Sequence, residues 1–248
     1  MKHAYLTSTG RVRENNEDQV GYFTNKAGIA LAIVADGIGG HQGGEVASEM
    51  AVEHLGHYFS LTDFTQPEDG ASWLKEHIAE ENALIHKTGQ QFKDLKGMGT
   101  TIVCLMFFGE SYLVAHIGDS RAYLLRHGEV RQLTQDHSLV NEMVQKGEIT
   151  RQEAQNHPQK NIITRTLGIE ESVKLDYDIK PLEVGDLFML STDGLTNMVS
   201  SDQLNAVLKE DNLNLKGKCQ LLIKEANQAG GTDNITVLIA ENSDVEAI

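Results

Sequence analysis

Apolar and polar residues alternate with two different periods in the first third of the chain. Residues 29–35 form an unbroken apolar run that ends at Asp36 and Gly37, as expected of a buried strand. From residue 45 to residue 59 the apolar residues recur at helical spacing instead, and a second such stripe covers about 70–92. The pattern therefore predicts strands followed by two helices.

The middle of the chain is rich in short strands. Four of them are predicted there: 100–107, 112–117, 122–126 and 130–133. The breaks between them carry Gly109, Gly118 and Gly128. Short strands separated by glycine-containing breaks are typical of hairpins, so we expect each strand to pair antiparallel with the next.

A polar stretch with helix signals follows these strands. Ser138 marks one helix start, and Thr150 with Glu153 has the sequence of a capping box. Residues 141–161 contain few side chains that could anchor a core, so we expect a flap on the surface there.

The last third returns to strands and helices. Ser200 and Gln203 form a second capping box, and a later helical stripe through Cys219 stops at Gly230. Four strands are predicted around these helices: 162–166, 173–180, 187–192 and 235–240. Strands and helices do not alternate one for one, which favours an α+β fold of antiparallel sheets covered by helices over a doubly wound parallel sheet.

Length and composition limit the class of protein. The chain has 248 residues with three prolines and no Ser/Gly-rich linker, which predicts a single domain over residues 1–248. Its longest apolar runs have seven residues, whereas a membrane helix needs roughly 20. Without a signal region, and with only Cys104 and Cys219 as buried thiols, we expect a soluble cytoplasmic protein.

Acidic residues outnumber basic ones by 36 to 21, which gives a net charge of −15. Such a chain repels DNA and RNA unless it has a local basic patch, and no run of Lys or Arg occurs. The charge therefore disfavours nucleic acid as a partner.

Several of these acidic residues stand where predicted strands begin or end. They are Glu17, Asp18, Asp36, Asp119, Asp193 and Asp233. Any single Asp-Gly or Asp-Asn is an ordinary turn dipeptide. Together, however, strand ends on one rim of a sheet would gather the carboxylates, which repel one another unless a divalent cation lies between them.

The ligand types select the metal and the chemistry. Carboxylates with backbone carbonyls and water suit Mg²⁺ or Mn²⁺, and no zinc-type spacing of Cys or His occurs. Several shared carboxylates indicate two ions about 3.5–4 Å apart, a spacing used for displacement at phosphorus. Arg13 lies four residues before Glu17, so it could hold a phosphate bidentately, although a plain surface arginine fits the spacing equally well.

Other phosphate and hydrolase signatures fail. The glycines from Gly37 to Gly44 fit neither the dinucleotide-binding nor the P-loop spacing. The residues six positions after the two cysteines are glutamates, whereas a cysteine-phosphatase loop needs arginine there, and no Gly-x-Ser-x-Gly elbow occurs.

The motifs, in their order, resemble the metal-dependent protein phosphatase family of type 2C (PPM), and in particular its small bacterial serine/threonine phosphatases. The resemblance spans residues 13–234 and is specific because the motifs occur as an ordered set. They are Arg13-x-x-x-Glu17-Asp18, Asp36-Gly37-x-Gly39-Gly40, Gly99-Thr100-Thr101, Gly118-Asp119-Ser120-Arg121, Asp136-His137-Ser138, Asp193-Gly194 and Asp233-Asn234.

The resemblance implies two stacked antiparallel sheets with helices outside and two Mn²⁺ or Mg²⁺ ions at one end. Asp36 would bridge both ions, with Asp193 and Asp233 completing one and the carbonyl of Gly37 serving the other. Glu17 or Asp18 would hold waters bound to the ions. Asp119 with Asp193 would hold a third, weaker ion, and Arg13 would hold the substrate phosphate. Residues 141–172 would form a mobile flap.

One position departs from the family pattern. Many eukaryotic members have a histidine directly after the Asp-Gly, as a candidate general acid, and here that residue is Ile38. The nearest histidine is His41. Either His41 or a metal-bound water could protonate the leaving oxygen, and a loop histidine bonded to the backbone is the alternative.

The function that this set implies is hydrolysis of phosphoserine and phosphothreonine in proteins by a metal-bound hydroxide, without a covalent phosphoenzyme. The expected partners are phosphorylated proteins and a eukaryotic-like Ser/Thr kinase, with the chain acting as a monomer. Two alternatives stay open: a regulatory module that binds a partner without turnover, and a metal-dependent phosphodiesterase or nuclease.

Overall fold

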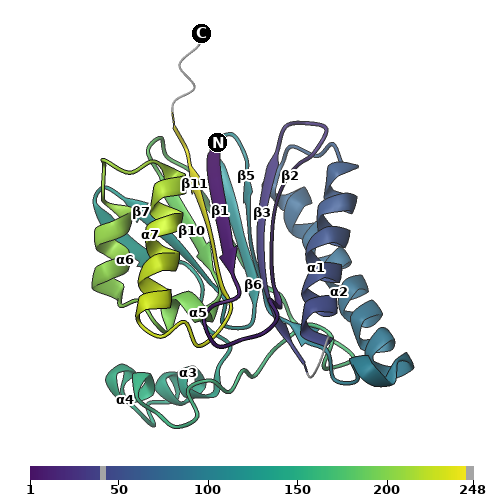
Figure 1. The fold of residues 1–248 in the computed structure, drawn as a ribbon. Coiled ribbons are helices and arrows are strands. Elements are labelled where there is room, and N and C mark those ends of the chain that lie inside the picture. The colour runs from purple at the N-terminus through teal and green to yellow at the C-terminus, as the bar shows by residue number, and fades with distance from the viewer. Residues whose placement is uncertain (40–42, 244–248) are drawn as a thin grey trace.

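The computed structural model of the chain describes residues 1–39 and 43–243 and contains two antiparallel β-sheets packed face to face (Figure 1). One sheet has the order β1-β11-β10-β7-β8, formed by Lys2–Ser8, Ile235–Glu241, Leu187–Ser191, Arg121–Arg126 and Glu129–Gln132. The other has the order β2-β3-β5-β6-β9, formed by Asp18–Thr24, Ala30–Ile38, Ile102–Phe107, Ser111–Ile117 and Asp176–Pro181. The short β4 (Gly99–Thr100) pairs with β3.

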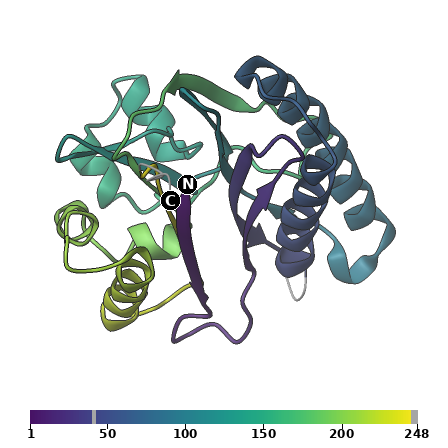
Figure 2. The same cartoon turned by 90° about the horizontal axis from the view of Figure 1, so that it is seen from above.

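Helices cover the outer face of each sheet (Figures 1 and 2). The helices α1 (Gly43–Ser60) and α2 (Pro67–Gln91) pack on the sheet that contains β3, and the short η1 (Lys93–Leu95) follows them. The helices α6 (Ser201–Leu208) and α7 (Leu215–Gln228) pack on the sheet that contains β11. The one-turn α5 (Asp193–Thr196) follows β10 at the lower end of the sandwich in Figure 1. The expected α+β sandwich with flanking helices is confirmed.

The apolar run 29–35 forms most of the buried strand β3, and both faces of this strand are covered. In β3, Ala32 and Val34 face the opposite sheet, while Leu31 and Ile33 face the helices, and all four are fully buried. Between the sheets, the ring of Phe188 lies 4.8 Å from that of Tyr112, edge to face. Burial on two faces explains why this strand has no polar alternation.

Local helix signals are accurate. Thr150 and Ser200 each accept a hydrogen bond from the backbone of the third residue of the helix, so both predicted capping boxes are confirmed. The predicted helices 45–59 and 70–92 correspond to α1 and α2 within a few residues. Caps and stripes depend on neighbours along the chain, which is why they can be recognised in the sequence.

Two expectations about strands are wrong. The break at Gly118 is no hairpin, because β6 and β7 lie in different sheets and the chain crosses between the sheets at this glycine. Residues 162–166 form no strand but only an isolated bridge between Ser138 and Ile163, since the segment has no neighbouring strand along its length. The N-terminal strand β1 and the one-turn α5 were not predicted; β1 lies at a sheet edge and is largely exposed.

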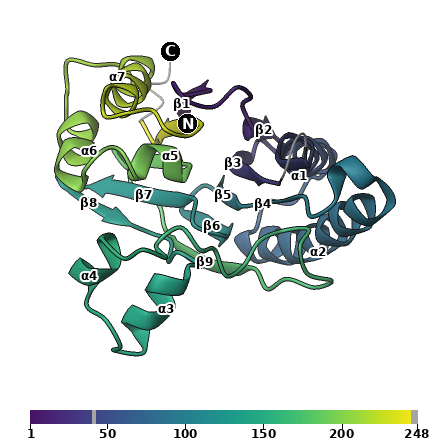
Figure 3. The same cartoon turned by 60° about the horizontal axis from the view of Figure 1, so that its bottom comes forward.

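Between β8 and β9 the chain leaves the sandwich and forms α3 (Leu139–Gln145) and α4 (Arg151–Gln155), which lie apart from both sheets (Figures 1 and 3). At the base of this segment, the backbone of Thr100 exchanges two hydrogen bonds with Leu167. We call residues 138–167 the flap segment. Within the described ranges, no helix combines the length and apolar character that crossing a membrane requires.

Candidate functional site

Acidic residues from both sheets converge at the lower end of the sandwich. Asp18 and Asp36 face each other in the register of β2 and β3. Asp119 follows β6, and Asp193 is the first residue of α5, directly after β10. Asp233 precedes β11 by two residues, and it is close enough, together with the other three, to act on the charge of Asp36.

The aspartates of this cluster have raised pKa values, because they are buried and close to one another. Burial, and then the charges of Asp18 and the other aspartates, raise the pKa of Asp36 well above its ordinary range. Burial likewise raises the pKa of Asp18 to about 7 and that of Asp119 to about 7, with the charge of Asp193 adding to both effects. Such raised values mean that the cluster carries more negative charge than its surroundings stabilise.

Among the residues that the structure describes, two buried oxygens of this cluster accept no hydrogen bond. They are Oδ1 of Asp18 and Oδ1 of Asp119, both on side chains that are less than a tenth exposed. The other oxygen of Asp18 accepts a hydrogen bond from Thr192 Oγ1 at 2.9 Å. Orphaned carboxylate oxygens at this depth are costly unless a cation approaches them, so the residues present fit a divalent cation.

Gly37 lies where no larger residue fits. A Cβ at this position would be 2.3 Å from the carbonyl oxygen of Gly44 and 2.6 Å from that of Glu17. The amide of Gly37 donates to the carbonyl of Glu17 at 3.1 Å, and the hydroxyl of Ser48 donates to the same oxygen at 2.6 Å. These contacts fix the backbone beside Asp36.

The donor set indicates which kind of ion it could hold. Across residues 1–39 and 43–243, no three His, Cys, Asp or Glu side chains are already gathered into a closed metal-binding group. This arrangement does not match the closed side-chain cage of a structural zinc site. It suits a hard cation such as Mg²⁺, which takes few carboxylates and keeps several waters.

Asn234 connects the loop that carries Arg13 to the strand that carries Asp233. Its Oδ1 accepts the amide of Glu17 at 2.8 Å, and its Nδ2 donates to the carbonyls of Thr9 at 3.0 Å and Asn15 at 2.8 Å. The sequence showed Asn234 only as part of a motif, because a side chain that bonds to distant backbone leaves no local pattern.

Arg13 lies at the open side of the cluster. Its Nη2 donates to Asp233 Oδ2 at 3.0 Å, and half of its side chain is exposed. A guanidinium in this place can turn from Asp233 to an incoming phosphate. The predicted His41 lies outside the described residues.

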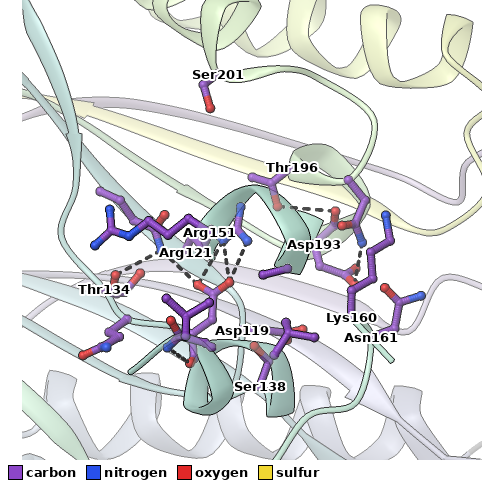
Figure 4. Close-up of a pocket in the computed structure, with 18 of the residues that line it drawn as sticks. Asp119, Arg121, Thr134, Ser138, Arg151, Lys160, Asn161, Asp193, Thr196 and Ser201 are labelled. Carbon is purple, nitrogen blue, oxygen red and sulfur yellow. Dashed lines mark hydrogen bonds and ion pairs between the residues drawn. The ribbon is translucent and has the colours of Figure 1, made fainter. Parts of the chain in front are cut away.

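A groove of about 1140 Å³ adjoins Asp119 and Asp193 (Figure 4). The start of α6 with Ser201 forms one wall, and Arg151 and Lys160 of the flap segment line the other side. The groove opens beside Asp119 and Asp193, so it connects the acidic end of the sandwich with the flap segment.

Comparison with known proteins agrees with this arrangement. The family described as Protein phosphatase 2C matches residues 7–220. The protein phosphatase PhpP of Streptococcus pneumoniae is 42% identical, with all of both chains covered. The serine/threonine phosphatase of S. agalactiae has a TM-score of 0.92 at 45% identity, covering 96% of this chain and 98% of its own.

A further similar solved structure contains metal ions. The catalytic domain of the serine/threonine protein phosphatase PstP, in complex with two manganese ions, has a TM-score of 0.84 at 34% identity and is covered over 98% of both chains. Family, relatives and structures agree over nearly the whole length. The chain belongs to the protein phosphatase 2C family.

Proposed function

We propose that this phosphatase hydrolyses phosphoserine and phosphothreonine in proteins and depends on Mn²⁺ or Mg²⁺. The observation that carries the proposal is the pair of buried carboxylate oxygens, on Asp18 and Asp119, that accept no hydrogen bond. Asp119 lines the groove, which we propose receives the peptide. The names of the relatives, which are serine/threonine phosphatases, support the same substrate class.

The aspartates would divide the ions among them. Asp36 would be shared by two ions, Asp193 and Asp233 would complete one, and the carbonyl of Gly37 would serve the other. A third, weaker ion would bind Asp119 together with Asp193. When bound, divalent cations supply an activated water and neutralise phosphoryl charge.

The remaining residues bind and orient the substrate and the waters. Arg13 would exchange Asp233 for the phosphate oxygens and hold them bidentately. Glu17 or Asp18 would accept hydrogen bonds from the waters. The leaving oxygen requires a proton, for which His41 or a water is the donor.

The groove and the flap segment would receive the peptide on either side of the phosphorylated residue. Residues 141–172 would act as a mobile flap on a single catalytic domain of residues 1–248, which works as a monomer. The physiological role would be to reverse a eukaryotic-like Ser/Thr kinase in the cytoplasm.

The first test is release of phosphate from a phosphothreonine peptide by metal-stripped protein, with and without Mn²⁺. Asp193→Ala is measured alongside, and Asp202→Ala, on the exposed side of α6, serves as the matched control. We expect Mn²⁺-dependent release that Asp193→Ala abolishes and Asp202→Ala retains. No release from folded protein that still binds Mn²⁺ would favour a binding module, and release only from a diester would favour a phosphodiesterase.

A further inference from the structure

The turn that carries Asp119 is held on both sides by one dipeptide at the base of the flap segment. Before Asp119, the amide of Gly118 donates to His137 Nδ1 at 3.0 Å, and the amide of His137 donates to the Gly118 carbonyl at 3.0 Å. After it, Arg121 donates to both carboxylate oxygens of Asp136, with Nη2 2.6 Å from Oδ2. Asp119 is thus placed by contacts to two consecutive residues.

The turn has little other freedom. Gly118 has a φ of +105°, and a Cβ there would lie 2.6 Å from Thr101 Cβ. The hydroxyl of Thr101 shares a hydrogen bond of 2.7 Å with that of Ser120. Because Oδ1 of Asp119 accepts no hydrogen bond, the direction of its carboxylate depends on this backbone turn.

The ring of His137 can hold Gly118 in only one proton arrangement. Because Nδ1 accepts the Gly118 amide, the ring proton must be on Nε2, which lies 3.1 Å from Asp176 Oδ2. Arg165 Nη1 lies 2.9 Å from the same Nε2 and 2.9 Å from Asp176 Oδ1. Two nitrogens that both carry protons cannot bond, so Arg165 donates to the carboxylate.

The surroundings keep this ring neutral. Burial lowers the pKa of His137 to about 4, and the ring of His116 stacks on it at 4.6 Å. His116 in turn lies 2.8 Å, through Nε2, from the Gln135 carbonyl. A neutral ring with an unprotonated Nδ1 is the form that the Gly118 contact requires.

His137 also contacts the C-terminal part of the flap segment. Its carbonyl accepts the amide of Thr164 at 2.8 Å, and the next residue, Ser138, forms a bridge with Ile163. Arg165 follows directly and reaches Asp176 on β9. One residue therefore connects the Asp119 turn, the edge of the sheet at β9 and the two ends of the flap segment.

We infer that His137 is a positioning residue for the phosphatase reaction: by accepting the Gly118 amide it aims the Asp119 carboxylate at the weaker ion site. In this role it would touch neither the substrate nor the ions. The inference rests on the proposed function, because it assigns Asp119 to an ion.

Two substitutions distinguish the contact that Nδ1 of His137 makes with Gly118 from the contact that its Nε2 makes with Asp176. In His137→Asn, the amide oxygen can take the place of Nδ1 and keep the Gly118 contact, while the reach to Asp176 is lost. In His137→Gln, the longer amide can reach Asp176, but the buried amide of Gly118 loses its acceptor. His54→Gln is the matched control, since His54 also contacts a buried carboxylate, Glu81 at 3.0 Å, but lies on α1.

The experiment measures the binding of Mn²⁺ to metal-stripped protein by calorimetry, in the absence of substrate. We expect His137→Gln to weaken the weakest Mn²⁺ step by about tenfold and to leave the tighter steps unchanged, as for loss of a residue that orients a ligand. His137→Asn and His54→Gln should stay within about twofold of the unchanged protein. Circular dichroism and melting temperatures check that each variant is folded.

Equal weakening by His137→Asn and His137→Gln would overturn the inference, because the Nδ1 acceptor would then be irrelevant. Lower melting temperatures with unchanged Mn²⁺ binding would also overturn it, since they indicate a merely structural role. If His137→Gln does not fold, Asp176→Ala carries the test, because Asp176 is partly exposed and its loss removes the acceptor that keeps the ring proton on Nε2. Weaker binding of the last Mn²⁺ then supports the inference, and unchanged binding overturns it.

Failure of the proposed function would look different. It would show in the unchanged protein, as an absence of both Mn²⁺ binding and phosphate release, before any variant is compared. That result would remove this inference together with the proposed function.

Discussion

Strand β10 carries an aspartate at each end, and the two have opposite surroundings. Before the strand, the carboxylate of the fully buried Asp186 accepts hydrogen bonds from Arg126 Nε at 2.7 Å and Nη2 at 2.5 Å. It also accepts a hydrogen bond from the amide of Glu183 at 2.9 Å. After it, Asp193 accepts Asn197 Nδ2 at 2.9 Å, and burial and the charge of Asp233 raise its pKa.

The difference separates structural charge from functional charge. The chain supplies the counter-charge of Asp186 itself, so this carboxylate stabilises the fold. At the other end the chain gathers like charges and leaves them uncompensated, which costs stability unless a cation binds. The two ends should therefore respond in opposite ways to the same chemical change.

Asp36→Asn gives the largest expected effect at the acidic end. Loss of the shared ligand should lower kcat/KM for a phosphothreonine peptide by at least about a thousandfold. In metal-stripped protein at pH 8 the same variant should resist urea better, because one buried like charge is gone. Phosphatase assays and urea unfolding measure the two effects, and near-normal turnover would contradict the ligand role.

Asp186→Ala should do the reverse at the other end. The Arg126 guanidinium would lose its buried partner, which lowers the free energy of unfolding by about 3–5 kcal/mol. Turnover per folded molecule should stay unchanged, because the acidic cluster lies at the far end of β10. Urea unfolding at low temperature, with activity measured on the folded fraction, gives both numbers. A loss of turnover without a loss of stability would break the comparison.

Arg13→Ala tests the guanidinium that contacts Asp233 at the open side of the cluster. The Arg13–Asp233 pair is largely exposed, so stability should change by less than about 1 kcal/mol. The KM for the phosphopeptide should rise by about tenfold, because the phosphate loses its bidentate partner. Arg13→Lys should recover part of that rise; unchanged KM in both variants would leave Arg13 as a surface arginine.

The smallest expected effect is the pH dependence of metal-stripped protein. The pKa values of Asp18 and Asp119, about 7, exceed the ordinary 3.8, so the folded chain binds these protons more tightly than the unfolded chain. The stability that this tighter binding gives is complete below pH 4 and is lost as pH rises through 7. His137, whose pKa is lowered to about 4, acts oppositely up to its ordinary value of 6.5.

Between pH 6.5 and pH 8 the two acids should therefore dominate. Stability should fall by about 1 kcal/mol in all. Calorimetry in the presence of a chelator measures it, and added Mn²⁺ at pH 8 should reverse the loss because the ion binds the folded chain. A rise in the free energy of unfolding over this interval would show that ionising the acidic cluster does not destabilise the metal-stripped protein.

The accuracy of the sequence-based predictions follows the range of each interaction. The helix caps at Thr150 and Ser200 and the buried strand in the apolar run 29–35 were predicted correctly, because their signals lie within a few residues. The hairpin at Gly118 was wrong, since a turn within a sheet and a crossing between sheets use the same glycine. The sequence cannot show which strands lie opposite each other.

The candidate site divides in the same way. The acidic residues stand out in the sequence because carboxylates at strand ends are unusual as a set. The residues that hold them, such as Thr192, Asn234 and His137, bond to partners more than a hundred residues away or to turns elsewhere in the fold. No spacing rule identifies such partners, so only the structure shows them.

The pairing of the first strand with the last has a consequence for how the protein is made. Residues 2–8 of β1 pair with residues 235–241 of β11, and β11 also pairs with β10. A ribosome must therefore deliver the strand after Asp233 before the first seven residues find their partner. Contacts so distant in sequence form late in folding. A nascent or truncated chain would thus lack both the sheet edge and one carboxylate of the cluster.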